Sequence, residues 1–584
     1  MRYLITLFFF VACLISGTQG QGFLKVNGKQ ITDGNGKEII LRGMGLGGWM
    51  LQEGYMLQIN GQGSQHTIKA RITEIIGKEK CDEFYTLWLQ NHMTRSDVDS
   101  LAKWGFNSVR LPMHYNLFTL PIEEEPIQGE HTWLTKGFEL TDSLLAWCKA
   151  NNMYLILDLH AAPGGQGKDA NISDYDENKP SLWESDLNKQ KTVALWRKLA
   201  EHYANEPMIG GYDLINEPNW TFEGKNRNGL EDTGNKPIWD FYYEITKAIR
   251  EVDRNHIIII EGNGWGNNYR GLERLWDDNL VMSFHKYWNA NTPNTLSNIL
   301  SLRDKFNVPV WLGESGENSD KWFTDCINLV EKNNIGWAWW PLKKINSVVC
   351  PLMIVAPPEY KQLTDYWNNR GPKPSSELAG KVLFELAGNL KAEKCRYNKD
   401  VIDAMFRQRN TSSTVPYNAK SLPGRIYAAD FDMGVAGMAY NDRDNENTGE
   451  EGKRAGNKGR QYRNDGVDIA VSTDDQIFSN GYKVISIENG EWMQFTIDVK
   501  KKGTYTINLR TTNKGGLVKL NAYKELPLTN EIEPVATSGN LTIPEGGATW
   551  ITAAIGKIKL PKGRVYLRLL VVEGGFELGY LELR

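Results

Sequence analysis

Two carboxylates stand at the ends of short apolar runs in the first two thirds of the chain. Glu217 follows the run Tyr212–Ile215 in the stretch GGYDLINEPNW, and Glu314 closes the stretch VPVWLGE. Opposed carboxyl groups are suited to glycoside cleavage, in which one protonates the leaving oxygen and the other attacks the sugar or activates water. Because the two tasks need different protonation states, the two groups need different surroundings.

Other polar or aromatic side chains end neighbouring runs, namely Arg110, Asp158, His160, Asn216, His285, Tyr287 and Trp340. Each has a structural explanation when it is taken alone, such as a surface cation, a satisfied core histidine or simple packing. A purely structural domain has no reason to direct all of them to one rim. Their convergence therefore indicates a site.

The residue types suggest how such a site would work on a sugar. Asn216 can hydrogen-bond a hydroxyl beside the scissile bond, while Arg110 and Tyr287 can hold a carboxylate ionised by donating hydrogen bonds. His160 and His285 can orient the substrate or the acid. A tryptophan of the WAWW stretch offers a face for one sugar ring, and the pattern leaves both Trp340 and Trp339 open.

The elements that must position these residues repeat along the chain. Eight β-branched or apolar runs alternate with amphipathic helical patterns, at Ile39–Gly43, Asn107–Pro112, Tyr154–His160, Gly210–Pro218, His256–Asn263, Val281–Tyr287, Val308–Glu314 and Ile335–Trp340. Eight strand–helix repeats predict an α/β fold, a (β/α)8 TIM barrel, over residues 21–409. In that fold the carboxyl ends of the strands carry the chemistry.

The last part of the chain has a different character. Residues 410–424, NTSSTVPYNAKSLPG, are polar and contain proline, which predicts a linker. Residues 425–584 hold short alternating runs with glycine and asparagine turns, which predict an all-β sandwich of the jelly-roll kind.

The first residues predict export. Arg2 precedes an apolar run and then small residues, as in a secretory signal that ends near Gly20, although Cys13 could also be a lipidation site. The predicted signal peptide covers residues 1–20 and implies a secreted, periplasmic or cell-surface protein. Five cysteines remain beyond it, without metal-ligand spacing, and Cys350 could pair with Cys395.

At this point the barrel segment resembles glycoside hydrolase family 5. The resemblance rests on NSVRLP, LDLHAAPGG, LINEP, HKYW and WLGE. It implies that Glu217 is the acid/base and Glu314 the nucleophile. The residues that match the family's other active-site positions are Arg110, His160, Asn216, His285, Tyr287 and Trp340, with Trp339 as a rival for the last. Family members retain anomeric configuration, which implies carboxyl groups about 5–5.5 Å apart.

The resemblance leaves the substrate open. The stretch LRGMGLGGWMLQEGYM is similar to the start of exo-acting β-1,3-glucanases, but MGL stands where an asparagine is usual. β-Glucan is the expected substrate, with mannan or xyloglucan as alternatives. The polar loops Gly164–Pro180 and Phe222–Pro237 could shape the cleft for exo or endo action.

The C-terminal segment resembles family 6 and related carbohydrate-binding modules through RIYAADFDMG, YRNDGVDIAV and GGFELGYLEL. The resemblance implies sugar stacking on Tyr462, with Trp550 as its partner. Two positions depart from the pattern. Tyr427, Ala428 and Ala429 replace the acidic calcium ligands, so a structural calcium there is doubtful, and Glu577 or Gly579 replaces the expected asparagine.

Two other functions compete with a glycosidase. A metal-dependent barrel hydrolase would need a His-x-His cluster after the first strand, where RGMGLGG stands, so no catalytic metal is expected. A catalytically silent glycan-binding protein would not need both carboxylates. The net charge of −4 gives no sign of a nucleic-acid partner, no stretch beyond the signal is long enough to span a membrane, and a monomer is expected.

Overall fold

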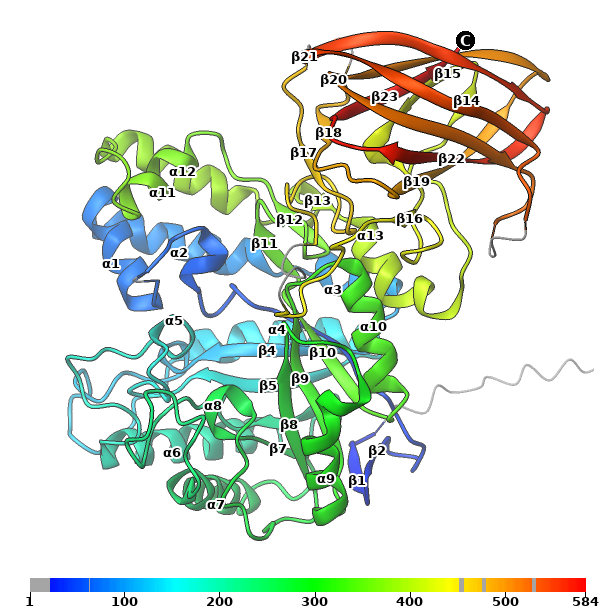
Figure 1. Ribbon diagram of the computed structural model, residues 1–584. Helices are drawn as coiled ribbons and strands as arrows, with labels where there is room; N and C mark the ends of the chain where they lie inside the picture. The colour runs from blue at the N-terminus through cyan, green and yellow to red at the C-terminus, as the bar shows by residue number, and fades with distance from the viewer. Residues whose placement is uncertain (1–21, 62, 451–455, 475–478, 528–531) are drawn as a thin grey trace, which may run out of the picture.

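The computed structural model describes residues 22–61, 63–450, 456–474, 479–527 and 532–584 (Figure 1). The predicted signal peptide, residues 1–20, lies outside these ranges. The described chain folds into a barrel domain and a β-rich C-terminal module, which lie side by side in Figure 1.

The barrel consists of eight parallel strands that close in the order β10-β3-β4-β5-β6-β7-β8-β9. The strands are β3 (Arg42–Gly45), β4 (Ser108–His114), β5 (Tyr154–Ala161), β6 (Ile209–Asp213), β7 (Ile258–Glu261), β8 (Leu280–Lys286), β9 (Val310–Gly316) and β10 (Gly336–Trp340). Each corresponds to one of the eight predicted runs, which confirms the fold class. Every residue of β4 and β5 is buried, because barrel strands are covered on both faces.

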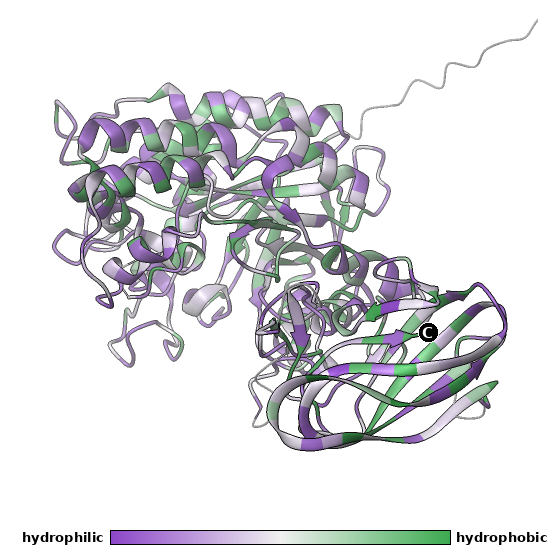
Figure 2. Ribbon diagram, turned by 90° about the horizontal axis from the view of Figure 1, so that it is seen from above, coloured by the Kyte–Doolittle hydropathy of each residue, from purple (hydrophilic) through white to green (hydrophobic). Residues whose placement is uncertain are grey.

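An outer ring of helices covers the barrel strands. It contains α3 (Arg95–Trp104), α4 (Thr135–Ala150), α6 (Asp186–Tyr203), α7 (Lys236–Arg250), α9 (Ser297–Phe306) and α10 (Asp320–Glu331). In α7 the buried residues Ile238, Phe241, Ile245 and Ile249 recur every three or four positions, which places them on one face. Figure 2 shows the mixed green and purple bands that such one-sided helices produce.

A helical layer extends the barrel domain. It was not predicted from the sequence. It combines α1 (Gln65–Ile76) and α2 (Lys78–His92), which follow β3, with α11 (Tyr360–Trp367) and α12 (Ser376–Gly388), which follow β10. These helices share a hydrophobic cluster that also includes Trp340. They meet because β3 and β10 are neighbours in the closed barrel, and Figure 1 shows them together as the blue and yellow-green helices.

The C-terminal module is all-β, as predicted. Its principal strands are β18 (Tyr482–Val484), β19 (Trp492–Val499), β20 (Gly503–Tyr523), β21 (Ala536–Leu560), β22 (Gly563–Glu573) and β23 (Leu578–Leu583). The first half of β20 pairs with β23 and the second half with β22, so this long strand passes from one group of strands to the other. The change falls at Gly515 and Gly516, whose positive φ angles of 79° and 141° suit a bend.

The segment predicted as a linker is packed against the rest of the protein. Its end forms β14 (Ser421–Leu422), which pairs with β19, and β15 (Gly424–Tyr427) follows directly and pairs with β23. Tyr417 is buried and its carbonyl accepts a hydrogen bond from Lys399 Nζ. This segment therefore forms ordered structure at the junction of the two domains.

Cys350 and Cys395, the possible pair, are free thiols in the structure, and each donates to backbone carbonyls. Among the described residues, no helix combines the length and apolar character needed to cross a lipid bilayer.

Candidate active site

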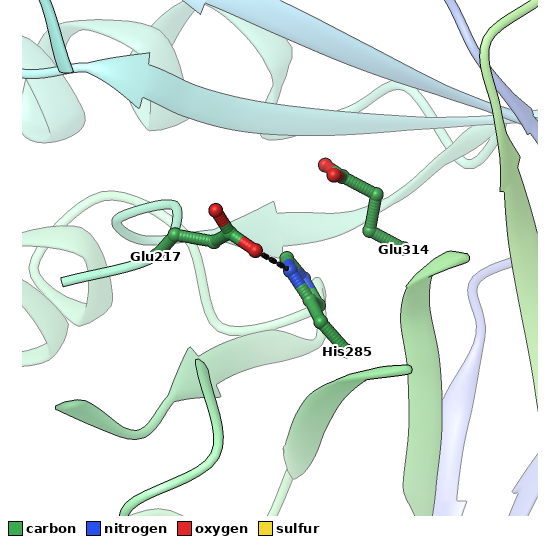
Figure 3. A group of neighbouring side chains, drawn as sticks. All are labelled: Glu217, His285 and Glu314. Carbon is green, nitrogen blue, oxygen red and sulfur yellow. Dashed lines mark hydrogen bonds and ion pairs between the residues drawn. The ribbon is translucent and has the colours of Figure 1, made fainter. Parts of the chain in front are cut away.

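The two carboxylates singled out in the sequence face each other inside the barrel rim. Glu314 lies on β9, and Glu217 lies four residues beyond the end of β6. Figure 3 shows them entering the site from opposite sides, with His285 of β8 beside Glu217. One oxygen of each carboxylate and one ring nitrogen of His285 all lie within 4.8 Å of one another.

Between the last residue of β6 and Glu217 the chain bends but stays hydrogen-bonded to the neighbouring strands. Leu214 and Ile215 remain fully buried, and the Asn216 amide donates to the Leu159 carbonyl of β5. At Glu217 the backbone turns into the left-handed region, with φ of 42°. Asn216 and Glu217 are thereby held at the carboxyl end of the barrel, as the sequence predicts.

Arg110 of β4 is the central cation of the site and is fully buried. Its guanidinium donates to Asp213 (3.0 Å), Glu261 (3.0 Å) and Glu314 (2.9 Å), and lies 3.2 Å from Asp158. Burial lowers the pKa of Arg110, but the surrounding carboxylates raise it by more, and the net pKa lies well above its ordinary value. Arg110 is therefore a permanent charge that balances a buried acidic ring.

Glu314 receives a donor on each oxygen. Arg110 Nη1 donates to Oε2 (2.9 Å), and Tyr287 Oη donates to Oε1 (2.5 Å). The pKa of Tyr287 is raised well above its ordinary value, first by burial and then by the charge of Glu314, so its hydroxyl keeps the proton that it donates. Both donors favour the ionised carboxylate that a nucleophile requires.

Glu217 has a different environment. Its Oε1 lies 2.6 Å from His285 Nδ1, and the other ring nitrogen of His285 lies 3.2 Å from Glu261 Oε1. Glu261 also accepts the Glu217 amide N–H at 2.7 Å. Glu261 thus fixes both the backbone of Glu217 and the ring that contacts its side chain.

The protonation of Glu217 follows from these surroundings. Burial raises its pKa, the hydrogen bond and charge of His285 lower it, and the charges of Glu314 and Glu261 raise it again, with a net increase. The carboxyl group of Glu217 therefore holds its proton to higher pH than an ordinary glutamate. The two carboxylates therefore have different surroundings, as two carboxylates with different chemical tasks need.

Asn216 and His160 form the wall beside these groups. Asn216 Oδ1 accepts from Arg110 Nη2 at 2.8 Å, which turns its amide nitrogen toward His160 Nε2 at 3.2 Å. His160 Nδ1 lies 2.7 Å from Asp158 Oδ2, and its ring is parallel to Trp340 with centroids 5.4 Å apart. The predicted residues of β4, β5, β6, β8, β9 and β10 are thus brought together in one network.

The structure distinguishes the two candidate tryptophans. Trp340 lies against His160, and its Nε1 donates to Tyr55 Oη (2.7 Å). Trp339 packs in the barrel core against Phe323 and Trp322. Trp340 is itself only 2% exposed, so the described site offers at most an edge of its ring to a ligand.

Three acidic residues of the site were not predicted from the sequence. The first, Asp213, is the last residue of β6 and accepts a hydrogen bond from Arg110. Glu261 ends the fifth predicted run, HIIIIEGN, and the rule that found Glu314 would also have selected it. Glu53 lies eight residues beyond β3 in a loop, so no strand periodicity marks it. It lies 3.6 Å from His160 Nε2, and burial raises its pKa to about 7 although His160 opposes this.

The two aromatic residues predicted in the C-terminal module have separate surroundings. Tyr462 is half-buried, stacks on Tyr482 with centroids 4.3 Å apart, and its carbonyl accepts from Arg396 of the barrel domain. Trp550 of β21 is half-buried, and its Nε1 donates to Thr473 Oγ1 at 3.2 Å. Tyr462, predicted as a sugar-stacking platform, thus contributes to the junction between the domains and has its ring stacked on Tyr482.

Comparison with known families matches both parts of the chain. The model described as Cellulase (glycosyl hydrolase family 5) matches residues 66–346, and the model described as Carbohydrate binding module (family 35) matches residues 463–583. The expected family 6 assignment of the module is not confirmed, since family 35 is the match. Alternating strands with glycine turns are common to β-sandwich modules, so this pattern could not separate the two families.

Three curated proteins illustrate the range of relatives. A β-xylosidase from Phanerodontia chrysosporium is 31% identical over 360 residues, which are 55% of this chain and 71% of that protein. Endoglucanase C from Acetivibrio thermocellus is 26% identical over 367 residues, 52% of this chain and 91% of that protein. A probable glucan 1,3-β-glucosidase A from Aspergillus niger is 25% identical over 255 residues, 43% of this chain and 56% of that protein.

Proposed function

We propose that this chain, which belongs to glycosyl hydrolase family 5, hydrolyses β-linked glucan by double displacement with Glu314 as nucleophile and Glu217 as acid/base. The observation that carries the proposal is the pair of facing carboxylates, whose nearest oxygens lie within 4.8 Å and whose surroundings favour opposite protonation states. Retaining enzymes place these groups about 5–5.5 Å apart, whereas inverting enzymes leave about 6.5–9.5 Å for a water. The spacing supports retention.

The proposed reaction consists of two displacements at the anomeric carbon. Glu314 attacks the anomeric carbon while the bond to the leaving oxygen breaks, and the proton of Glu217 passes to that oxygen. Water then enters, Glu217 takes its proton, and the resulting hydroxide displaces Glu314 from the anomeric carbon. The product keeps the configuration of the substrate because the carbon is inverted twice.

The neighbouring residues position these two groups. Arg110 and Tyr287 hold Glu314 as an anion and fix its direction. His285 and Glu261 hold Glu217 in place, and the positive charge of His285 compensates the charge that appears when Glu217 gives up its proton. Asn216, anchored by Arg110, is placed to bind a sugar hydroxyl next to the scissile bond.

The acid role of Glu217 predicts a characteristic pH profile. Its raised pKa means that activity on polysaccharide persists toward neutral pH and falls as pH rises through that pKa, because the ionised group has no proton to donate. Glu217→Gln should remove this alkaline limb and lower kcat/KM on polysaccharide by about 10²–10⁴-fold. The loss should be far smaller on an aryl glycoside with an acidic phenol, which leaves without protonation.

The control for this experiment is Glu201→Gln on the outer surface of α6, which should match the unsubstituted protein on both substrates. Equal losses for Glu217→Gln on polysaccharide and on the activated aryl glycoside would contradict the acid assignment. Retention of the alkaline limb in that variant would do so as well.

The substrate assignment rests on the family and on the names of the relatives. Those names include an endoglucanase, a glucan 1,3-β-glucosidase and a β-xylosidase, and two of the three act on β-glucans. β-Glucan is therefore the substrate that we propose, while mannan and xyloglucan remain alternatives that the same carboxylates could serve.

Hydrolysis of a panel of polysaccharides tests this assignment. We expect the highest rate of reducing-end release on a β-glucan, and Glu314→Ala should abolish that release. Resolved product sizes then separate exo action, which gives one small product, from endo action, which gives a ladder. Highest activity on mannan or xylan would reject the substrate, and no turnover of any glycan would reject the function.

We infer that catalysis needs no metal ion. Glu217, His285 and Glu314 have the spacing of a possible metal site. However, both oxygens of Glu314 already accept hydrogen bonds, and His285 Nδ1 is occupied by Glu217. The positive charge that an ion would supply is already provided by Arg110.

The remaining proposals concern the setting of the enzyme. An exported monomer that acts on an external glycan fits a hydrolase followed by a carbohydrate-binding module. We propose that the module holds the polysaccharide near the barrel, with Trp550 as the aromatic contact to test first. Tyr462 is the weaker candidate because its ring stacks on Tyr482. A calcium ion at Ala428 and Ala429 has no support, since both side chains are small, apolar and buried.

A further inference from the structure

Three aspartates lie buried together where the barrel domain meets the C-terminal module. Asp320 is the first residue of α10, Asp400 belongs to α13 (Lys399–Ile402), and Asp465 lies in a loop of the module. Their exposed fractions are 0%, 0% and 1%, and one carboxylate oxygen from each lies within 4.8 Å of the others. Segments far apart in the sequence thus supply three carboxylates to one enclosed point.

Hydrogen bonds account for only half of the carboxylate oxygens. Asp320 Oδ1 accepts from Asn464 Nδ2 (2.8 Å), Asp400 Oδ2 accepts from the Asn464 amide (2.7 Å), and Asp465 Oδ2 accepts from Arg463 Nε (2.8 Å). The second oxygen of each aspartate is shielded from solvent and accepts no hydrogen bond from the described residues. Such oxygens are costly to bury unless a cation meets them.

The charge of the cluster is also unbalanced. Arg463 pairs with Asp465, and its remaining N–H groups donate to the backbone carbonyls of Phe431 and Asp432. Lys399, which adjoins Asp400, directs its ammonium to the Tyr417 carbonyl. Arg463 is therefore the one guanidinium that pairs directly with a carboxylate of the cluster, and Arg396 adds a further positive charge near Asp400. Three carboxylates still carry more charge than their direct partner offsets.

Protonation would be the other way to relieve this excess. Burial, followed by the charges of Asp400 and Asp465, raises the pKa of Asp320 well above its ordinary value. Burial likewise raises the pKa of Asp465 to about 7, although Arg463 opposes it. Protons and a bound cation are thus alternative ways to offset this negative charge, and calcium titration distinguishes them.

We propose that Asp320, Asp400 and Asp465 form a calcium site that joins the barrel domain to the C-terminal module. All the candidate ligand atoms are carboxylate oxygens, which suit a hard cation and lack the nitrogen or sulfur that zinc favours. Three carboxylates with one directly paired guanidinium suit a divalent cation. Ca²⁺ also accepts irregular sets of six to eight oxygens, so bidentate carboxylates and water can complete its shell.

This site would lock the two domains together. Asp320 and Asp400 come from the barrel side and Asp465 comes from the module, so the full ligand set exists only when the two are docked. The same surface carries direct contacts, including Asp320 N to the Asn464 carbonyl (3.0 Å) and Asn318 Nδ2 to the Asn447 carbonyl (2.7 Å). Calcium would add to these contacts and resist separation of the domains.

Calcium binding to the full chain tests the proposal without reference to catalysis. After dialysis against a chelator, isothermal titration with Ca²⁺ should give one site per chain that is lost in Asp400→Asn. Terbium luminescence on excitation of the protein should report the same site, since Tyr440 lies beside it and its hydroxyl accepts the Gly466 amide (3.1 Å). Added Ca²⁺ should displace the terbium.

The matched control is Asp432→Asn. Asp432 is also a fully buried aspartate of the module, but both of its oxygens accept hydrogen bonds from Thr496. This variant should lose stability and keep calcium binding. Binding that survives in Asp320→Asn, Asp400→Asn and Asp465→Asn would place the ion elsewhere and overturn the proposal.

Thermal unfolding of the unsubstituted chain provides a test that needs no variant. Saturating Ca²⁺ should raise the unfolding midpoint by at least about 3 °C over the chelated protein, because the ion binds the docked state only. Turnover of an aryl glycoside well below that midpoint should be unchanged by the chelator. Absence of both a binding signal and a midpoint shift would show that protons alone neutralise the cluster.

Discussion

Glu314→Ala should lower kcat/KM by at least roughly 10⁴-fold on every glycoside, including aryl glycosides with acidic leaving groups. The reason is that no other group of the site can form the covalent intermediate. Glu217 is the group to which we assign proton donation, and the carboxylates of Asp158, Asp213 and Glu261 are held by Arg110. The measurement is steady-state hydrolysis of a polysaccharide and of an activated aryl glycoside.

The loss in Glu314→Ala has a chemical signature that a folding defect lacks. A small anion such as azide can occupy the space left by the side chain and attack the anomeric carbon of an activated β-glycoside. The product should be the α-glycosyl azide, inverted once. Glu244→Ala on the exposed face of α7 is the control and should keep full activity. Ordinary turnover by Glu314→Ala, or no rescue by azide in a folded variant, would contradict the nucleophile assignment.

Arg110→Met should have the largest effect on stability. It would leave the buried carboxylates of Asp158, Asp213, Glu261 and Glu314 without their shared cation, and the removal of one partner from a buried ionic group costs about 3–5 kcal/mol. Uncompensated carboxylates have raised pKa values in the folded state. The variant should therefore regain stability as pH falls through those values, where the groups become neutral.

Urea unfolding at pH 5 and pH 8 measures this effect, and the deficit of Arg110→Met should be larger at pH 8. Arg110→Lys is the matched control, because it keeps the charge but cannot direct donors to several carboxylates at once. It should be intermediate in stability and low in activity. Equal stability of Arg110→Met and the unsubstituted chain at pH 8 would show that the acidic ring does not depend on this residue.

Much of the barrel could be predicted because its strands are marked twice, by an apolar run and by the polar residue that ends it. Glu314 and His160 carry this double mark, whereas Arg110 lies within β4, and the closed order of the strands brings all three together. The same logic applies to Asn216 and Glu217, although the strand itself ends at Asp213. The apolar pattern continued because Leu214 and Ile215 stay buried beyond the ladder.

The remaining features depend on contacts that strand periodicity does not encode. Glu53 reaches the site from a loop, and only the closed barrel shows that it lies near His160. The helices after β3 and β10 meet because those strands are neighbours, although their helices are almost 300 positions apart in sequence. Tyr462 has the aromatic character of a sugar platform, but its ring is already in contact with Tyr482.

The backbone conformation at Glu217 limits the stability against unfolding that this fold can reach. A φ of 42° suits glycine, and a residue with a side chain held there costs on the order of 1–3 kcal/mol. A glycine would relax the turn but remove the group that donates the proton. The protein therefore accepts lower resistance to unfolding so that the acid can reach its substrate. Substitutions meant to raise the thermal stability of the enzyme should therefore be placed elsewhere, because relief of the backbone strain at Glu217 would remove the carboxyl group of this residue.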